Sequence, residues 1–281
     1  MAKKELILEL KQKAKDLRKE IIAMIYNAQS GHPGGSLSAI DMLVGLYYCK
    51  LRIEPKNPMW QDRDRFVLSK GHCSPAIYAV LADKGYFPKS ELNGYRKIDR
   101  LLQGHADLST PGIDFAGGAS GQGICFALAI ALACRLDKRN CNVYAMIGDG
   151  ESQEGAVWEA SMAASFHNVD NLIVILDKNQ LQQTGKTKEI MDIGNVVLKW
   201  KAFGWNVIDI NGHDMSQIVK ALDKASKLKN KKPTIIISNT IKGKGVSFME
   251  LNHKFHGKAP NDEEYKKAIE EIEKIDVKNF K

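Results

Sequence analysis

The sequence predicts an α/β fold, a doubly wound parallel sheet flanked by helices. Two short apolar runs, residues 143–147 and 172–176, are typical of buried strands and are separated by a stretch compatible with a helix. Each run ends in polar residues, which are Gly148-Asp149-Gly150 after the first and residues 177–180 after the second. Ligands bind at the carboxyl ends of the strands in open parallel sheets, so we expect a functional site there.

The N-terminal part is expected to be largely helical. Leucine and isoleucine recur at helical spacing over residues 5–28, which predicts one amphipathic helix that ends at the Gly- and Pro-containing segment 30–35. Ser36 or Ser38 is expected to cap a second helix that runs through residue 46. The next expected elements are a strand at 66–68 and helices at 76–84 and 90–97.

A glycine-rich segment, residues 117–123, is expected to open an apolar helix over 124–135. Such a turn can bind an anion at the helix N-terminus. It does not match Gly-x-Gly-x-x-Gly and follows no clear strand, so dinucleotide binding is not expected. The other expected elements are helices at 153–167 and 215–228, strands at 205–210 and 234–238, and a C-terminal helix from about residue 262. Without a repeat or a linker, residues 1–281 are expected to form a single domain.

Composition excludes several classes of protein. The net charge is +8, but Lys and Arg are scattered among acidic residues without an aromatic-interleaved basic stripe, so no nucleic-acid partner is expected. The five cysteines form no Cys-x-x-Cys pair and indicate reduced thiols in a cytoplasmic protein. No apolar run approaches the length of a membrane span, and no membrane association is expected.

The Gly-Asp-Gly turn and Asn179 form the central candidate site. Gly-Asp-Gly alone is often only a tight turn, but Asn179 follows the next strand along, so Asp149 and Asn179 should meet at one sheet edge. Carboxylate and amide oxygens suit Mg2+, which usually shares its coordination shell with a phosphate group. Glycines let backbone N–H groups approach an anion closely.

Four of the seven histidines lie in Gly-rich turns next to expected strand ends, while His167, His213 and His253 are interpreted as ordinary hydrogen-bonded surface or core residues. No Cys or carboxylate partner recurs at metal-ligand spacing, so a zinc site is not expected. Imidazoles in converging turns can donate hydrogen bonds to developing oxyanions and shuttle protons near neutral pH. The four are His32, His72, His105 and His256.

These segments resemble those of thiamine diphosphate enzymes. Gly-Asp-Gly followed some thirty residues later by Asn resembles their diphosphate-binding motif, and residues 148–160 are similar to the transketolase version. The turns around the four histidines resemble transketolase active-site segments in the same order, and the resemblance spans roughly residues 5–275. It implies that His32, His72 and His105 face the thiazolium ring and the sugar carbonyl. It places His256 near the diphosphate and the substrate hydroxyls. It also implies that Glu154 lies at a subunit interface linking two cofactor sites. The residues implied are His32, His72, His105, His256 and Glu154 for catalysis; His72, Gly118, Gly148, Asp149, Gly150, Asn179 and His256 for thiamine diphosphate; and Asp149, Asn179 and the Leu181 carbonyl for Mg2+ or another divalent cation such as Ca2+ or Mn2+.

The sequence also departs from full-length transketolases. Ala119-Ser120 replaces the family's usual Pro-Leu in the glycine-rich turn, and the pyrimidine-binding and C-terminal domains are expected on a separate chain. The resemblance therefore implies the N-terminal subunit of a split transketolase of the pentose phosphate pathway, whose C-terminal subunit is a separate chain, in a dimeric or two-plus-two assembly. The implied reaction transfers a two-carbon ketol group from a ketose phosphate to an aldose phosphate. Alternatives are a related enzyme for a sulfonated or other sugar, a deoxyxylulose phosphate synthase, the alpha chain of a 2-oxoacid dehydrogenase, and a non-catalytic binding or regulatory subunit.

Overall fold

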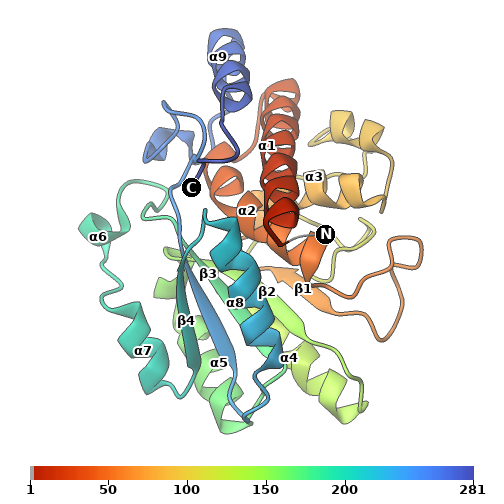
Figure 1. Ribbon diagram of the computed structural model, residues 1–281, viewed down its shortest axis with the longest axis vertical. Helices are drawn as coiled ribbons and strands as arrows, with labels where there is room; N and C mark the ends of the chain where they lie inside the picture. Colours follow the sequence, from red (N-terminus) through yellow and green to blue (C-terminus); the bar gives the residue numbers. More distant parts are fainter. Residues whose placement is uncertain (1–2) are drawn as a thin grey trace.

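The computed structural model describes residues 3–281, and within that range five parallel strands form one sheet in the order β1-β2-β3-β5-β4 (Figure 1). All five strands lie where the apolar runs predicted them, and the predicted fold class is confirmed. The strands are β1 (Arg65–Leu68), β2 (Val143–Gly148), β3 (Leu172–Lys178), β4 (Asn206–Asn211) and β5 (Thr234–Asn239).

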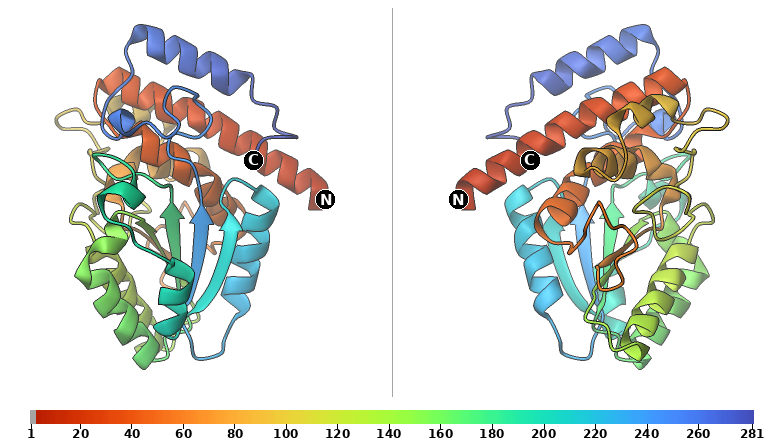
Figure 2. Two further views of the ribbon diagram at one scale, coloured as in Figure 1. Left: turned by 90° about the vertical axis from the view of Figure 1, so that its left-hand side faces the viewer. Right: turned by 90° about the vertical axis from the view of Figure 1, so that its right-hand side faces the viewer.

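Helices cover both faces of the sheet, which makes it doubly wound (Figure 2). Along β2, Tyr144 and Met146 contribute to the larger hydrophobic core, whereas Val143, Ala145 and Ile147 contribute to the second core on the opposite face. The alternation follows from the two-residue period of a strand. The larger core lies against α1 (Lys3–Ala28), α2 (Pro33–Cys49), α3 (Ser74–Lys84), α8 (Met215–Lys227) and α9 (Asp262–Glu273), and the second against α4 (Gln122–Leu136), α5 (Gly155–Phe166) and α7 (Val196–Ala202).

Helix α2 begins earlier than expected, at Pro33, and neither predicted serine caps it. The Ser36 hydroxyl donates to the carbonyl of His32 at 2.8 Å, and the Ser38 hydroxyl donates to Gly35 and to Asp177. Proline is favoured in the first turn because its missing N–H would have no partner there. His32, rather than a serine, is therefore the residue that directly precedes α2.

Several short elements differ from the expectation. The predicted helix at 90–97 is a 3-10 helix, η2 (Lys89–Gly94), and the segment between β3 and β4 contains two helices that were not expected. Trp200 on α7 is fully buried, so this segment is ordered by tertiary packing rather than by a long periodic pattern. The other elements are η1 (Gly71–Cys73), η3 (Glu151–Gln153), α6 (Thr187–Ile190) and η4 (His253–Phe255).

A buried ionic chain joins the N-terminal helices to the loop after β5. Arg18 on α1 makes two hydrogen bonds to the Asp41 carboxylate, at 2.9 and 2.6 Å, and Nδ1 of His213 lies 2.7 Å from the same carboxylate. The backbone N–H of Ile241 donates to Nε2 of His213 at 2.9 Å. Because Nε2 accepts this bond, the proton of the His213 ring is on Nδ1, which donates a hydrogen bond to the Asp41 carboxylate. Arg18 also donates to the carbonyl of Lys244.

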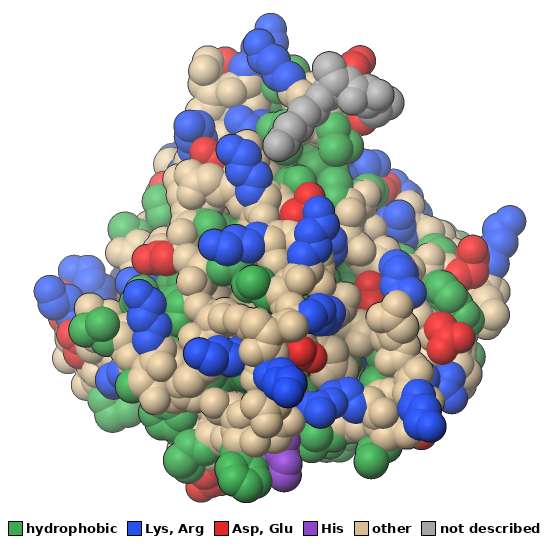
Figure 3. Space-filling model, turned by 60° about the horizontal axis from the view of Figure 1, so that its bottom comes forward, with side chains coloured by type: hydrophobic (Ala, Val, Ile, Leu, Met, Phe, Trp, Pro, Cys, Tyr) green, Lys and Arg blue, Asp and Glu red, His purple; other side chains and the backbone are tan. Residues whose placement is uncertain are grey.

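Basic residues are dispersed over the face of the molecule shown in Figure 3. Figure 3 shows Lys and Arg side chains spread over one face with hydrophobic and acidic side chains between them.

Along residues 3–281, no helix combines the length and the apolar character needed to span a lipid bilayer. None of the five cysteines forms a disulfide; Cys73, Cys134 and Cys141 are buried, and Cys49 and Cys125 are half-buried.

Candidate functional site

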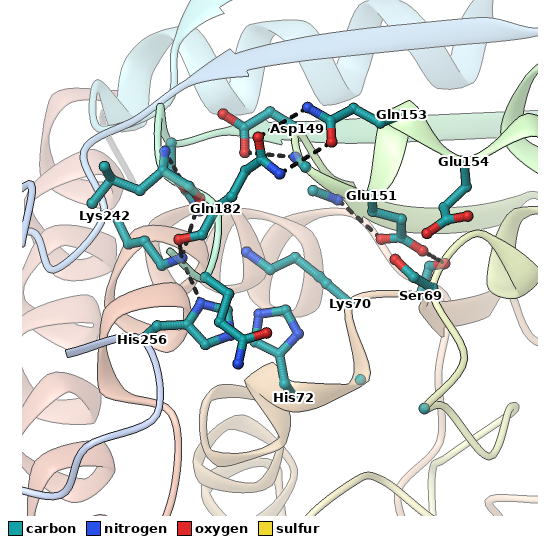
Figure 4. A pocket seen from close by; sticks show the side chains of 18 residues that line it. Ser69, Lys70, His72, Asp149, Glu151, Gln153, Glu154, Gln182, Lys242 and His256 are labelled. Atoms are coloured by element: carbon teal, nitrogen blue, oxygen red, sulfur yellow. Dashed lines mark hydrogen bonds between the residues drawn. The ribbon is translucent and has the colours of Figure 1, made fainter. Parts of the chain in front are cut away.

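A cavity of about 370 Å3 opens at the carboxyl ends of four strands (Figure 4). Its lining comes from the segments after β1, β2, β3 and β5, as expected for a ligand site in a parallel sheet. The lining includes Lys70, His72, Gly118, Gly148, Asp149, Gly150, Glu154, Asn179, Leu181, Lys242 and His256.

The structure brings the three expected metal ligands together at this edge. Asp149 is buried, and one of its carboxylate oxygens accepts the backbone N–H of Gln180 at 2.8 Å. Gln180 lies between Asn179 and Leu181, and the Asn179 side-chain oxygen accepts the Leu181 N–H at 3.2 Å. Burial, followed by the charge of Asp177, raises the pKa of Asp149. A cation at this position would therefore stabilise the carboxylate.

The space and the donors fit a divalent cation with a diphosphate. A Cβ atom placed on Gly148 would meet nothing closer than Glu151 Cβ at 4.0 Å, and one on Gly118 would meet nothing within 4 Å. The carbonyl of Leu181 faces a cationic group, because the Lys242 ammonium donates to it at 3.1 Å. No cluster of three or more His, Cys, Asp or Glu side chains suited to a metal occurs in the described chain; this set consists instead of one carboxylate, one amide and one backbone oxygen, which are ligands of Mg2+.

The four histidines expected in the site converge. His72 and His256 stack with ring centroids 5.1 Å apart, and His32 lies 5.3 Å from His72 and 5.4 Å from His256. His105 is more exposed, with its ring centroid 6.4 Å from that of His32. The rings come from loops distant in sequence, so only the fold brings them together.

All four imidazoles are neutral near pH 7. Burial, followed by the charge of Arg96, lowers the pKa of His32 to about 4, and burial with Lys242 lowers the pKa of His256 to about 3. The pKa values of His72 and His105 are lowered too, first by burial and then by Lys70 and Arg96 respectively. Nδ1 of His32 is buried without a hydrogen-bond partner in the described structure. Neutral rings can both donate and accept protons, as proton transfer to a bound substrate requires.

Two buried lysines in the site were not found from the sequence. Lys242 joins one of the oxygen donors to the histidines, because its ammonium lies 2.8 Å from Nδ1 of His256 and 3.1 Å from the Leu181 carbonyl. Burial, followed by repulsion from Lys70, lowers the pKa of Lys242 to about 8. Lys70 forms a fully buried ion pair with Asp177. Both lysines follow strands of the sheet, so the strand-end rule that identified Asp149 would have found them if applied to β1 and β5.

Two glutamates beside the Gly-Asp-Gly turn have different environments. Glu151 is buried and accepts the N–H groups of Gly121 and Gly148, at 2.9 and 3.1 Å, and the Ser69 hydroxyl. The glycine-rich turn expected to bind an external anion thus uses its Gly121 N–H for a carboxylate of the chain. Glu154, expected at an interface, is exposed at the rim of the cavity and precedes α5.

Comparison with known proteins identifies similar chains. Residues 10–280 match the family described as "Transketolase, thiamine diphosphate binding domain". The chain is 39% identical over 266 residues to one of the subunits of the apulose-4-phosphate transketolase of Phocaeicola vulgatus, covering 93% of this chain and 94% of that protein. It is 43% identical over 268 residues to the 6-deoxy-6-sulfo-D-fructose transketolase subunit SqwG of a Clostridium species, covering 95% and 97%. A crystal structure of Campylobacter jejuni transketolase superposes with a TM-score of 0.89 and 36% identity over 95% of this chain, which spans 44% of that longer chain.

Proposed function

The chain belongs to the transketolase family and contains its thiamine-diphosphate-binding domain, and we propose that it is the cofactor-binding subunit of a two-chain transketolase. The proposed reaction moves a two-carbon ketol group from a ketose to an aldose. The observation that supports it most directly is the cavity that contains the Asp149, Asn179 and Leu181 oxygens, in which Lys242 links the Leu181 carbonyl to His256 of the histidine cluster.

Each part of the cavity has a proposed task. The Asp149 carboxylate, the Asn179 amide oxygen and the Leu181 carbonyl hold Mg2+. Gly118 and Gly148 leave room for the diphosphate, and Gly150 lines the same cavity. Bound thiamine diphosphate supplies the electron sink that allows a carbon–carbon bond of the sugar to break.

The histidines act on the sugar. His32, His72 and His105 orient the sugar carbonyl and hydroxyls and move protons as neutral acids and bases, while His256 holds the substrate beside the diphosphate. Their low pKa values support this role because protonated rings could not accept a proton.

A second chain is proposed to supply the pyrimidine-binding part of the enzyme. The match covers 94% and 97% of two relatives named as transketolase subunits, but 44% of the Campylobacter enzyme. Residues 1–281 are proposed to form one diphosphate-binding domain that is active only with this partner.

Two copies of this chain are proposed to meet near Glu154. The neighbouring helices α4 and α5 expose large apolar side chains, with Phe126 54%, Met162 55% and Phe166 79% exposed. Apolar surface of this kind is typical of contacts between proteins. Contact between two copies there would join two cofactor sites in an assembly with two partner chains.

The proposed substrates are a ketose phosphate donor and an aldose phosphate acceptor. A sulfonated sugar is the second candidate, because the relative that is 43% identical is named for 6-deoxy-6-sulfo-D-fructose. Both sugars carry an anionic group, so the difference lies in recognition rather than in the ketol transfer.

Reconstitution tests the proposal. The purified chain, a partner chain carrying the pyrimidine-binding domain, thiamine diphosphate and Mg2+ are mixed with xylulose 5-phosphate and ribose 5-phosphate, and in a second arm with 6-deoxy-6-sulfofructose and an aldose phosphate. We expect turnover in at least one arm with both chains, and none with either chain alone. Turnover by this chain alone would contradict the two-chain assignment, and metal-dependent cofactor binding without turnover by any partner would identify a binding subunit instead.

A further inference from the structure

Asp177 is the buried hub beneath the oxygen donors of the site. It lies at the end of β3, where it is only 2% exposed, and its Cα pairs with Gly148 of β2 and Ser238 of β5. Its carboxylate accepts hydrogen bonds from four side chains that come from four different segments. They are Ser38 at 2.7 Å, Asn179 at 3.2 Å, Lys70 and Thr240.

These contacts determine which way the Asn179 amide faces. An ionised carboxylate only accepts hydrogen bonds, so the Asn179 atom beside it must be the NH2 group and not the oxygen. The buried Lys70 ammonium pairs with this carboxylate and the Ser38 and Thr240 hydroxyls donate to it, so Asp177 acts as an acceptor toward its neighbours. The same NH2 group lies 3.3 Å from the Ser38 hydroxyl.

We propose that Asp177 is a positioning residue that orients the Asn179 amide so that its oxygen, not its NH2 group, faces the divalent cation. This inference rests on the proposed function, which assigns a metal to the site. The Asn179 oxygen accepts the Leu181 N–H at 3.2 Å, on the side of the residue that supplies the third metal oxygen. A reversed amide would present its NH2 donor to the cation and would remove one of three protein ligands.

A competing role for Asp177 is that of counter-ion for Lys70. The two side chains are each 2% exposed, and an unpaired charge at that depth is costly. The single variant Asp177→Asn therefore mixes two effects, because it removes the acceptor for the amide and also leaves Lys70 without its partner. Charge-neutral double variants separate these effects.

The test measures Mn2+ affinity by electron paramagnetic resonance of the free ion, at thiamine diphosphate concentrations that saturate each variant. Asp177→Asn should bind Mn2+ about 10- to 100-fold more weakly, as is typical when a group that orients a metal ligand is lost. Ser38→Ala is the matched control, because it removes the other acceptor of the same NH2 group but leaves the carboxylate. It should change the affinity by less than about threefold.

Two charge-neutral variants decide between the roles. In Asp177→Asn/Asn179→Asp the ligand is a carboxylate that offers oxygen in either orientation, so Mn2+ affinity should return to within about threefold of the wild type. In Lys70→Met/Asp177→Asn the buried charge is balanced but the amide has no carboxylate to orient it, so the affinity should stay about 10-fold or more below the wild type. A counter-ion role predicts recovery in both.

Circular dichroism and urea unfolding confirm that each variant is folded, and the two double variants carry the test if Asp177→Asn alone is not. Wild-type affinity in Lys70→Met/Asp177→Asn would overturn the inference, as would a folded Asp177→Asn/Asn179→Asp that fails to recover. Failure of the proposed function gives a different result, namely a wild-type chain that binds thiamine diphosphate without any dependence on a divalent ion.

Discussion

The ammonium of Lys242 lies 2.8 Å from Nδ1 of His256. An ammonium only donates hydrogen bonds, so Nδ1 is the acceptor and the proton of this neutral ring is on Nε2. Lys242 thus fixes the tautomer of a histidine that lines the cavity.

Replacing this lysine should weaken cofactor binding. Lys242→Met removes a buried cation that faces the cavity, and one charge-assisted hydrogen bond contributes about 1.5–3 kcal/mol, or roughly 10- to 100-fold in affinity. Isothermal titration with thiamine diphosphate and Mg2+ measures the loss. Lys244→Met is the matched control, because that ammonium lies over the Phe280 ring and not in the cavity. Equal affinities in the two variants would contradict the assigned role.

The metal assignment predicts the behaviour of Asp149→Asn. The carboxylate is buried and its pKa is raised, so its charge is unfavourable for folding. The free energy of unfolding of the Asn variant should therefore lie within about 1 kcal/mol of the wild-type value. The variant should nevertheless lose the rise in melting temperature that thiamine diphosphate with Mg2+ gives the wild type. Asp137→Asn, at an exposed position, should keep that rise. An unchanged shift in Asp149→Asn would remove the metal assignment.

The two neighbouring glutamates should respond oppositely to truncation. Glu151→Ala leaves the N–H groups of Gly121 and Gly148 without their acceptor and should lower the free energy of unfolding by about 2–3 kcal/mol, measured in urea. Glu154→Ala removes an exposed side chain and should change it by less than about 0.5 kcal/mol. Glu154→Ala should instead weaken self-association in sedimentation experiments with the reconstituted enzyme. A large stability loss in Glu154→Ala would show that its role is internal.

Protonation of the histidine cluster should destabilise the fold in mild acid. The unfolded chain protonates His32 near pH 6.5, whereas the folded chain does so only near pH 4. The unfolded state therefore binds more protons within this window, and stability present above pH 6.5 is lost as the pH falls towards 4. When the pH falls from 7.5 to 5.0, the free energy of unfolding of His32→Asn should decrease by about 1 kcal/mol less than that of the wild type. This figure allows for the partial exposure of the ring.

Urea unfolding at both pH values measures this difference. His167→Asn, at an exposed ring, is the matched control and should follow the wild type. Identical pH dependence in His32→Asn and the wild type would show that this ring does not contribute.

The fold was predictable because each strand can be recognised from a short stretch of the sequence. Val, Ile and Leu runs such as Leu172–Leu176 are long enough to span a sheet, and polar residues mark where each ends. The start of α2 and the existence of α7 were not predictable in this way. The Ser36 and Ser38 hydroxyls donate to the carbonyls of His32 and Gly35 at the start of α2 instead of capping it, and the burial of Trp200 stabilises α7.

The site was predictable only in part, for a related reason. Asp149 and Asn179 each belong to a strand end, so local rules placed them at one edge. The hydrogen-bond partners of Asp177 lie between 2 and 139 residues away along the chain, and those of Glu151 lie between 3 and 82 residues away. No rule of sequence spacing connects such partners. Tertiary contact alone reveals that these carboxylates organise the loops around the cavity.

The buried chain from Arg18 through Asp41 to His213 has a practical consequence for handling the protein. Trimming α1 past Arg18 would strip the Asp41 carboxylate of its guanidinium and free the Lys244 carbonyl, two residues from Lys242. An N-terminal affinity tag should therefore be better tolerated than N-terminal shortening. We expect a chain shortened past Arg18 to bind the cofactor more weakly even where it still expresses well, because the segment that carries Lys242 loses this contact.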